Sequence, residues 1–299
     1  MKITVIGVGA VGGWFGGRLA ATGHDVTFVA RPGSETLQAL RERGLVLGEE
    51  DPIRVDAVES LADAPPADVV LLAVKVTGGE AAATLLEGID GQALVACTQN
   101  AVEVPSAVAG VVGTQRTLPG VVRGFFHHTG PAKVAFHGGP ISYTFGTWDG
   151  GASGVVKQFS RALQEAGIEG VVHPDIFVDV WSKAMFVGPF GGLGALSGRP
   201  LGVLRTDMRG TLQAVVAEVD AVARASGVNL PADAVEQVMS FADAMPAGAT
   251  SSMQRDLGAG RASELDAQIG AIVRAGERLG VSTPLHGLLF DTLRYGRQA

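Results

Sequence analysis

The sequence has a single cysteine and no block of basic residues, and these gaps exclude several classes of protein. Cys97 has no partner for an internal disulfide, so nothing indicates an oxidising compartment and we expect a cytoplasmic protein. The formal net charge is -7. Without clustered Lys and Arg, neither nucleic acid nor an anionic membrane is an expected partner, and a small-molecule substrate fits better.

Long apolar runs are also missing. No stretch reaches the about 18 uninterrupted apolar residues that a membrane span needs. Residues 1–6 resemble the start of a signal peptide, but glycines and Arg18 interrupt the run before its apolar region is complete. We therefore expect neither a membrane helix nor a secretion signal.

What the chain has in quantity is glycine, 43 residues, and a hydrophobic content of 46%. In the first half, short β-branched runs alternate with helix-like segments, which predicts a parallel sheet covered by helices. We expect strands at 3–6, 26–29, 68–74 and 93–97, and helices at 10–21, 37–43 and 79–86. The β-rich segments at 111–122, 132–136 and 142–145 are expected to extend one edge of this sheet.

From about residue 175 the pattern changes to long helical windows. These lie at 176–187, 208–226, 232–244, 263–279 and 284–295. The expected fold class is α/β, with an N-terminal doubly wound parallel sheet of the Rossmann type followed by an all-α C-terminal domain. We place the domain boundary between residues 173 and 174, giving domains 1–173 and 174–299.

The turn after the first strand carries a dinucleotide fingerprint, Gly7-Val8-Gly9-Ala10-Val11-Gly12. Gly7 permits a tight turn, Gly9 lets the backbone approach a pyrophosphate, and Gly12 lets the helix pack on the sheet. Ala10 and Val11 open the helix, whose free N–H groups face the phosphates. A glycine-rich turn that binds nothing is the alternative.

The end of the second strand distinguishes between nicotinamide cofactors. NAD-binding proteins usually have an acidic residue there, whereas this chain reads Phe28-Val29-Ala30-Arg31. Arg31 is placed to pair with a 2′-phosphate, which favours NADPH/NADP+. Lys75, after the third expected strand, is a candidate to face the cofactor or substrate. Solvated surface side chains are the alternative for both Arg31 and Lys75.

With these motifs in order, the chain resembles the ketopantoate reductase family over essentially its whole length. Besides the fingerprint, the resemblance rests on Thr98-Gln99-Asn100, Trp181-Ser182-Lys183, Thr250-Ser251-Ser252-Met253 and Ser263-Glu264-Leu265-Asp266. It implies a cofactor-binding domain at 1–173 and a helical domain for substrate binding and dimerisation at 174–299. A homodimer is compatible with the apolar helices near the C-terminus.

The resemblance implies reduction of a ketopantoate-type 2-keto acid to the 2-hydroxy acid by NADPH, as in pantothenate biosynthesis. Lys183 matches the family's general acid, which protonates the carbonyl oxygen as hydride arrives. Glu264 matches the acidic residue that orients the substrate, Asn100 a residue that contacts cofactor and substrate, and Ser252 a hydroxyl for the substrate carboxylate. Helix caps and separate surface charges are the alternatives.

The chain departs from the family at two positions of the substrate site, where Val187 and Gly191 stand in place of asparagines. Loss of two amides removes hydrogen bonds that discriminate a polar substrate, so we expect a more apolar and roomier pocket. Ala101 replaces the usual glycine after Asn100 and would resist a positive φ. These departures favour a bulkier apolar 2-keto acid over ketopantoate.

Two other functions stay open. The first is imine reduction, in which the substrate already carries a proton and Lys183 matters less. The second is a non-catalytic NADPH-binding sensor, against which the retention of Lys183 and Glu264 argues. No metal is expected at His127, His128 and His137, which lack matching acidic or cysteine ligands. Cys97, in an apolar run, is expected in the core.

Overall fold

The computed structural model describes residues 1–77 and 81–296. The chain folds into two compact units. The first unit comprises Met1–Lys75, Glu80–Gln99 and Val104–Ile176, and the second comprises Val76–Gly79, Asn100–Glu103 and Phe177–Ala299. Two short segments, one after Lys75 and one after Gln99, are therefore grouped with the helical unit.

The first unit is built on a six-stranded sheet in the order β4-β2-β1-β5-β6-β7, with every pair parallel. The strands are β1 (Lys2–Ile6), β2 (Asp25–Val29), β4 (Asp56–Val58), β5 (Val69–Leu72), β6 (Leu94–Cys97) and β7 (Thr117–Leu118). Because the chain starts in the middle and winds outward on both sides, this is the doubly wound arrangement expected from the sequence. The predicted fold class is confirmed.

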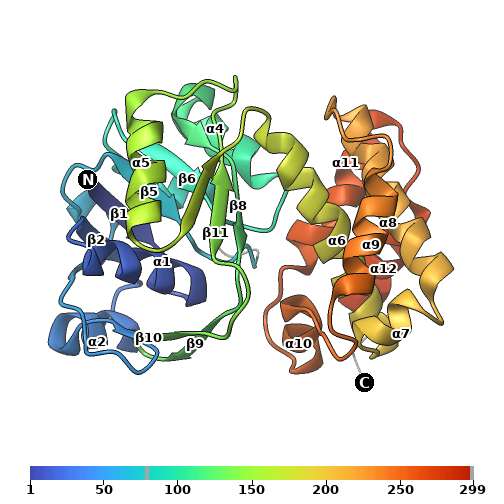
Figure 1. Ribbon diagram of the computed structural model, residues 1–299, viewed down its shortest axis with the longest axis horizontal. Helices are drawn as coiled ribbons and strands as arrows, with labels where there is room; N and C mark the ends of the chain where they lie inside the picture. The colour runs from blue at the N-terminus through green and yellow to red at the C-terminus, as the bar shows by residue number, and fades with distance from the viewer. Residues whose placement is uncertain (78–80, 297–299) are drawn as a thin grey trace. The chain divides into compact units, whose positions relative to one another are not determined.

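Helix α1 (Ala10–Ala21) follows β1 and packs on two sheets at once (Figure 1). Its glycines make this approach close. A β-carbon at Gly16 would lie 2.6 Å from Cζ of Phe28 in β2, and one at Gly17 would lie 2.8 Å from Cδ2 of Leu47 in β3 (Val46–Leu47). The run of small residues therefore lets one helix serve both layers.

Two small sheets complete the strands of this unit. One has the order β3-β10-β9, with β9 (Phe126–Gly130) and β10 (Lys133–Phe136), and the other has the order β12-β11-β8, with β8 (Gly120–Arg123), β11 (Ser142–Phe145) and β12 (Glu169–Val172). The prediction that the β-rich segments extend one edge of the main sheet is wrong except for β7. Of the predicted segments, β8 and β11 instead pair with each other and β10 pairs with β9, both antiparallel.

The remaining helices of this unit are α2 (Glu35–Arg43), α3 (Ala82–Leu85), α4 (Val104–Val112) and α5 (Gly154–Glu165), with 3-10 turns at Leu61–Asp63 and Thr114–Arg116. α2 begins two residues before the predicted start because the hydroxyl of Ser34 accepts from the N–H of Leu37 at 3.2 Å. Within the described residues the helix predicted at 79–86 covers only Ala82–Leu85; residues 79–80 lie outside them. The start of the β-rich segment at 111–122 is the end of α4.

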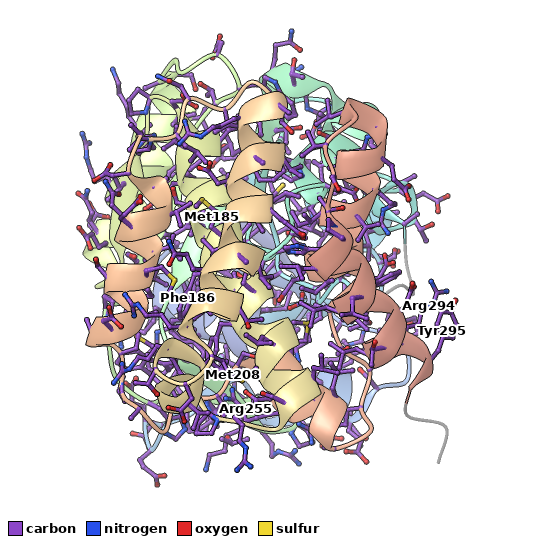
Figure 2. All side chains as sticks on the ribbon, turned by 90° about the vertical axis from the view of Figure 1, so that its right-hand side faces the viewer. Met185, Phe186, Met208, Arg255, Arg294 and Tyr295 are labelled. Carbon is purple, nitrogen blue, oxygen red and sulfur yellow. The ribbon has the colours of Figure 1, made fainter. Side chains whose placement is uncertain are left out.

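The second unit is helical and comprises α6 (Ile176–Ser197), α7 (Leu201–Arg205), α8 (Arg209–Ala225), α9 (Ala234–Ala244), α10 (Ser252–Gly258), a π-helical turn (Asp266–Gly270), α11 (Ala271–Leu279) and α12 (Pro284–Tyr295). α8 packs against α7, α9, α11 and α12 (Figure 1). On α6, Met185 is fully buried and the ring of Phe186 lies 4.9 Å from that of Phe241 on α9 (Figure 2). Among the described residues no helix is long and apolar enough to cross a membrane.

α6 is longer than the predicted 176–187 because it runs through Pro189 to Ser197. Glycine and proline there indicate a helix end in sequence, since proline cannot donate its i→i−4 hydrogen bond. Residues 188–195 are largely buried, however, and packing on both sides outweighs the lost bond. The other predicted helical windows are confirmed in position, although 263–279 begins with the π turn.

Candidate functional site

The turn after β1 has the geometry that each fingerprint glycine requires. Gly7 has φ of 96°, and a β-carbon there would lie 2.8 Å from Cγ1 of Val74. A β-carbon at Gly12 would lie 2.0 Å from the carbonyl oxygen of Gly7, so only glycine fits. At Gly9 a β-carbon would meet no atom within 4 Å. Gly7 and Gly12 are thus required by the fold, whereas Gly9 faces open space.

This turn lies where strand order reverses about β1, the place at which doubly wound sheets bind their ligands. The N–H of Gly7 donates to the carbonyl oxygen of Val29 at 3.2 Å, which holds the turn against the end of β2. The first intrahelical bond of α1 runs from Gly13 to Gly9 at 2.9 Å. The N–H groups of Ala10, Val11 and Gly12 in the first turn have no intrahelical acceptor, and these residues fit a pyrophosphate.

Arg31 and Lys75 both lie on the carboxyl side of this sheet. Arg31 is exposed two residues beyond β2, and its carbonyl oxygen accepts from the N–H of Ser34 at 3.1 Å. Lys75 is exposed three residues beyond β5. Arg31 lies two residues after Val29, whose carbonyl oxygen accepts from the glycine turn.

In the second unit, Lys183, Val187 and Gly191 share one face of α6 because they are spaced four residues apart. Lys183 and Val187 are half-buried and Gly191 is buried. The side chain of Lys183 is therefore partly shielded from water.

The space beside Gly191 is filled by α10. A β-carbon at Gly191 would lie 2.5 Å from Cε of Met253 and 3.0 Å from Oγ of Ser251. Met253 is 2% exposed. The side chain of Met253 therefore places an apolar thioether methyl beside Gly191, and the expectation of a more apolar and roomier pocket stays a prediction.

The two serines of the Ser-Ser-Met motif have different surroundings. Ser251 is buried and caps α10 by accepting from the N–H of Gln254 at 2.9 Å. Ser252, the candidate for the substrate carboxylate, is the first residue of α10 and is exposed. Its hydroxyl is thus accessible to a ligand, whereas that of Ser251 is used by the fold.

Glu264 is held by two hydrogen bonds within the second unit. Its Oε1 accepts from the N–H of Val76 at 3.2 Å, and its Oε2 accepts from Nε2 of Gln268 at 3.3 Å. Gln268 is 8% exposed and lies in the π turn. Sequence reasoning missed Gln268 and Met253. The signals that could have found them are the i+4 spacing of Gln268 from Glu264 and the place of Met253 in the Ser-Ser-Met motif.

Asn100, in the short segment that follows β6, is half-buried and belongs to the helical unit. The next residue, Ala101, is buried and is not among the described residues with positive φ, of which Ala132 is the only non-glycine. The replacement of glycine by Ala101 therefore introduces no backbone strain here. Val102 packs against the apolar core of the helices and anchors the segment.

The structure shows the surroundings of His127, His137 and Cys97, for which the sequence predicts neither metal binding nor catalysis. The rings of His127 and His137 lie 4.3 Å apart, and the described residues contain no group of three or more His, Cys, Asp or Glu suited to a metal. Cys97 is buried, and burial raises the pKa of its thiol to about 12. The hydroxyl of Tyr143 donates to its carbonyl oxygen at 2.8 Å. Cys97 is a core residue, as predicted.

Family comparison agrees with this arrangement of motifs. The family model described as Ketopantoate reductase PanE/ApbA matches residues 3–150, and that of the C-terminal part of the same family matches residues 175–296. The chain belongs to the ketopantoate reductase family. It is accordingly an oxidoreductase, and the resemblance inferred from the sequence is confirmed.

Individual members of the ketopantoate reductase family match nearly the whole chain. The 2-dehydropantoate 2-reductase of Caulobacter vibrioides is 31% identical over 296 residues, covering 98% of each chain. The crystal structure of the 2-dehydropantoate 2-reductase from Methylococcus capsulatus superposes with a TM-score of 0.90 at 28% identity, covering 98% of this chain and 96% of that one. A complex of D-mandelate dehydrogenase with NADH shares the fold at 23% identity, with a TM-score of 0.86 and coverage of 99% and 98%.

Proposed function

We propose that this protein reduces a 2-keto acid to the 2-hydroxy acid with NADPH, with Lys183 as the proton donor. The observation that carries the proposal is the presence in one unit of the half-buried Lys183 on α6 and a carboxylate, Glu264, held by two hydrogen bonds. The glycine turn with its open Gly9 position supports binding of the cofactor in the first unit. The first unit would thus bind the cofactor and the second the substrate.

The cofactor, when bound, supplies the hydride that forms the new C–H bond at the carbonyl carbon. As that bond forms, the C=O π electrons move to oxygen, and the Lys183 ammonium gives a proton to the developing alkoxide. Water then reprotonates the lysine. In this proposal Glu264 orients the substrate, Asn100 positions cofactor and substrate, and the accessible hydroxyl of Ser252 binds the substrate carboxylate.

Two features support a particular cofactor and substrate. Arg31, in place of an acidic residue beyond β2, favours the 2′-phosphate of NADPH. Val187 and the contact of Met253 with Gly191 favour an apolar group on the substrate. D-mandelate dehydrogenase, by its name, acts on an aromatic 2-hydroxy acid, which agrees with apolar substrates on this fold. We also propose that the protein is cytoplasmic and forms a homodimer.

Steady-state oxidation of NADPH tests this function, with ketopantoate beside branched and aromatic 2-keto acids. We expect higher kcat/KM for the apolar substrates, and a Lys183→Ala variant with kcat lower by about three orders of magnitude and an unchanged Kd for NADPH. Arg31→Ala should raise the Kd for NADPH by about tenfold or more and leave the Kd for NADH unchanged. Equal turnover by Lys183→Ala would exclude the lysine as donor, and preferred use of cyclic imines would favour imine reduction.

A further inference from the structure

One arginine of α11, Arg274, joins two segments that are far apart in sequence. Its Nη2 donates to Oε2 of Glu103 at 2.7 Å and its Nε to Oε1 of the same carboxylate at 3.4 Å. Its Nη1 donates to Oδ1 of Asp266 at 3.0 Å, and its Nη2 also reaches the carbonyl oxygen of Asp266 at 3.3 Å. A single guanidinium therefore binds a carboxylate in a bidentate manner and fixes the start of the π turn.

Both of these segments carry a residue of the proposed site. Asn100 lies three residues before Glu103, and Glu264 lies two residues before Asp266. Since each residue extends the backbone by about 3.5 Å at most, Asn100 lies within about 11 Å of Glu103 and Glu264 within about 7 Å of Asp266 along the backbone. The position of Arg274 is thus linked to the positions of both Asn100 and Glu264.

The local sequence is adapted to this contact. A β-carbon at Gly270 would lie 2.9 Å from Oδ1 of Asp266 and 3.0 Å from Nη1 of Arg274. Any side chain there would push into the pair. The π turn that ends at Gly270 adds a residue to the helix, a feature that is frequent at functional sites. The hydrogen bonds with Glu103 and Asp266 also raise the pKa of the guanidinium, which stays charged.

We propose that Arg274 is a positioning residue for the reduction, which holds Asn100 and Glu264 in register through Glu103 and Asp266. This inference rests on the proposed function. Arg274 touches neither substrate nor cofactor in it. Its contribution is to keep the two segments at fixed separation, and a small misplacement of such groups lowers the rate strongly.

The chain offers a matched control in Arg278, one turn further along α11. Nη1 of Arg278 also contacts Glu103, at 3.3 Å, and its side chain is 60% exposed. Asp266, by contrast, pairs with Arg274. Removal of Arg278 therefore takes away an arginine contact to Glu103 and leaves the link between Glu103 and Asp266 intact.

The experiment compares Arg274→Met, Arg278→Met and Asp266→Asn in the full-length protein. Measurements are kcat and KM for the best 2-keto acid, Kd for NADPH and the thermal midpoint. We expect Arg274→Met to lower kcat/KM by about 10- to 100-fold and to change the Kd for NADPH by much less, since only the Asn100 arm contacts the cofactor in the proposed function. Arg278→Met should stay within about twofold, because exposed ion pairs contribute little. Asp266 is 61% exposed, so Asp266→Asn should keep the fold while it removes the negative charge from one arm of the link.

The double variant Arg274→Met/Asp266→Asn distinguishes positioning from general stability. If the two residues act through one link, the double variant loses no more kcat/KM than Arg274→Met alone. Additive losses, or equal kcat/KM in Arg274→Met and Arg278→Met, would overturn the inference while leaving the proposed function in place. A wild-type protein that reduces no 2-keto acid would overturn the proposed function, and the inference with it.

Discussion

Two helices of this protein are rich in glycine, one in each unit, and their glycines meet different kinds of neighbour. In α1, Gly12 faces the carbonyl oxygen of Gly7 and Gly16 faces the ring of Phe28, so two of its glycines meet backbone or a rigid ring. In α6, Gly191 and Gly194 instead face the tips of flexible side chains, Cε of Met253 and Oε1 of Gln254.

This difference separates an invariant contact from an adjustable one. Backbone atoms that hold a turn cannot move aside, so a larger residue at Gly12 would break the turn. A methionine tip can rotate away at modest cost, because Met is unbranched and has several rotatable bonds. Substitutions on the α6 face that carries Lys183 can therefore be accommodated by movement of side chains on α10. The glycine turn, Gly7 to Gly12, cannot accommodate them.

The largest expected effect on binding and stability comes from substitution in the glycine turn. Gly12→Ala should abolish NADPH binding and lower the free energy of unfolding by about 3 kcal/mol, because the β-carbon overlaps the carbonyl of Gly7. Gly9→Ala is the matched variant, since Gly9 has extended backbone and open space. Gly9→Ala should leave the free energy of unfolding of the apo protein unchanged. It should raise the Kd for NADPH by at least about tenfold, because the added methyl keeps the pyrophosphate away from the backbone. Isothermal titration and denaturant unfolding measure both effects.

The two variants separate the roles of two neighbouring glycines. If Gly9→Ala bound NADPH as tightly as the wild type, the open position at Gly9 would not be part of the cofactor site. If Gly12→Ala were as stable as the wild type, the contact with Gly7 would be less rigid than the backbone implies.

A smaller effect is expected in α6. Gly191→Asn restores the family's side chain, and it should cost about 1–3 kcal/mol of unfolding free energy because Met253 occupies the space. Adding Met253→Ala removes the overlap and should recover most of this loss. The double variant should also shift kcat/KM toward ketopantoate by about tenfold, since a buried amide adds a hydrogen bond for a polar group.

Met253→Ala alone is the control for this pair, because it creates a cavity and should itself be destabilising. A double variant whose loss of unfolding free energy equals the sum of the two single losses would show that positions 191 and 253 are not coupled. The comparison of the two helices would then fail, since α6 would be as intolerant as α1.

The sequence predicted those parts of the fold that depend on local pattern. The β1 strand, the glycine turn and α1 follow one another within 21 residues, and their periodicity and glycines suffice to define them. The small sheets were not predicted, because β3 pairs with β10, which lies far along the chain at Lys133–Phe136. Such pairing leaves no local signal.

The candidate site shows the same division. Lys183 and Glu264 were found through motifs, whereas the partners that hold Glu264 were not. Val76 contributes a backbone N–H, which any residue other than proline supplies, so its role has no sequence signature. The filling of the space at Gly191 by Met253 likewise depends on how α10 packs on α6.

The smallest expected effect concerns a polar contact inside the helical unit. Glu218 of α8 accepts from the N–H groups of Leu285 and His286 at 2.8 and 2.9 Å and from Nδ1 of His286 at 2.7 Å, and so caps α12. Burial raises the pKa of Glu218, but these hydrogen bonds favour the carboxylate and outweigh burial, so the pKa lies below its ordinary value.

A carboxylate whose pKa is depressed in the folded state stabilises the protein above its unfolded pKa, and this contribution is lost as pH falls through the folded value. Glu218→Gln should therefore lower the unfolding free energy by about 1–2 kcal/mol at pH 7, and by progressively less as pH falls through the depressed pKa of the folded protein, where Glu218 of the wild type is itself protonated. Denaturant unfolding from pH 7 to pH 3 measures this, with exposed Glu236→Gln of α9 as the control. A constant difference between Glu218→Gln and wild type over that range would mean that the cap acts through its shape and its hydrogen bonds, and that the charge of Glu218 contributes nothing to the packing of α8 on α12.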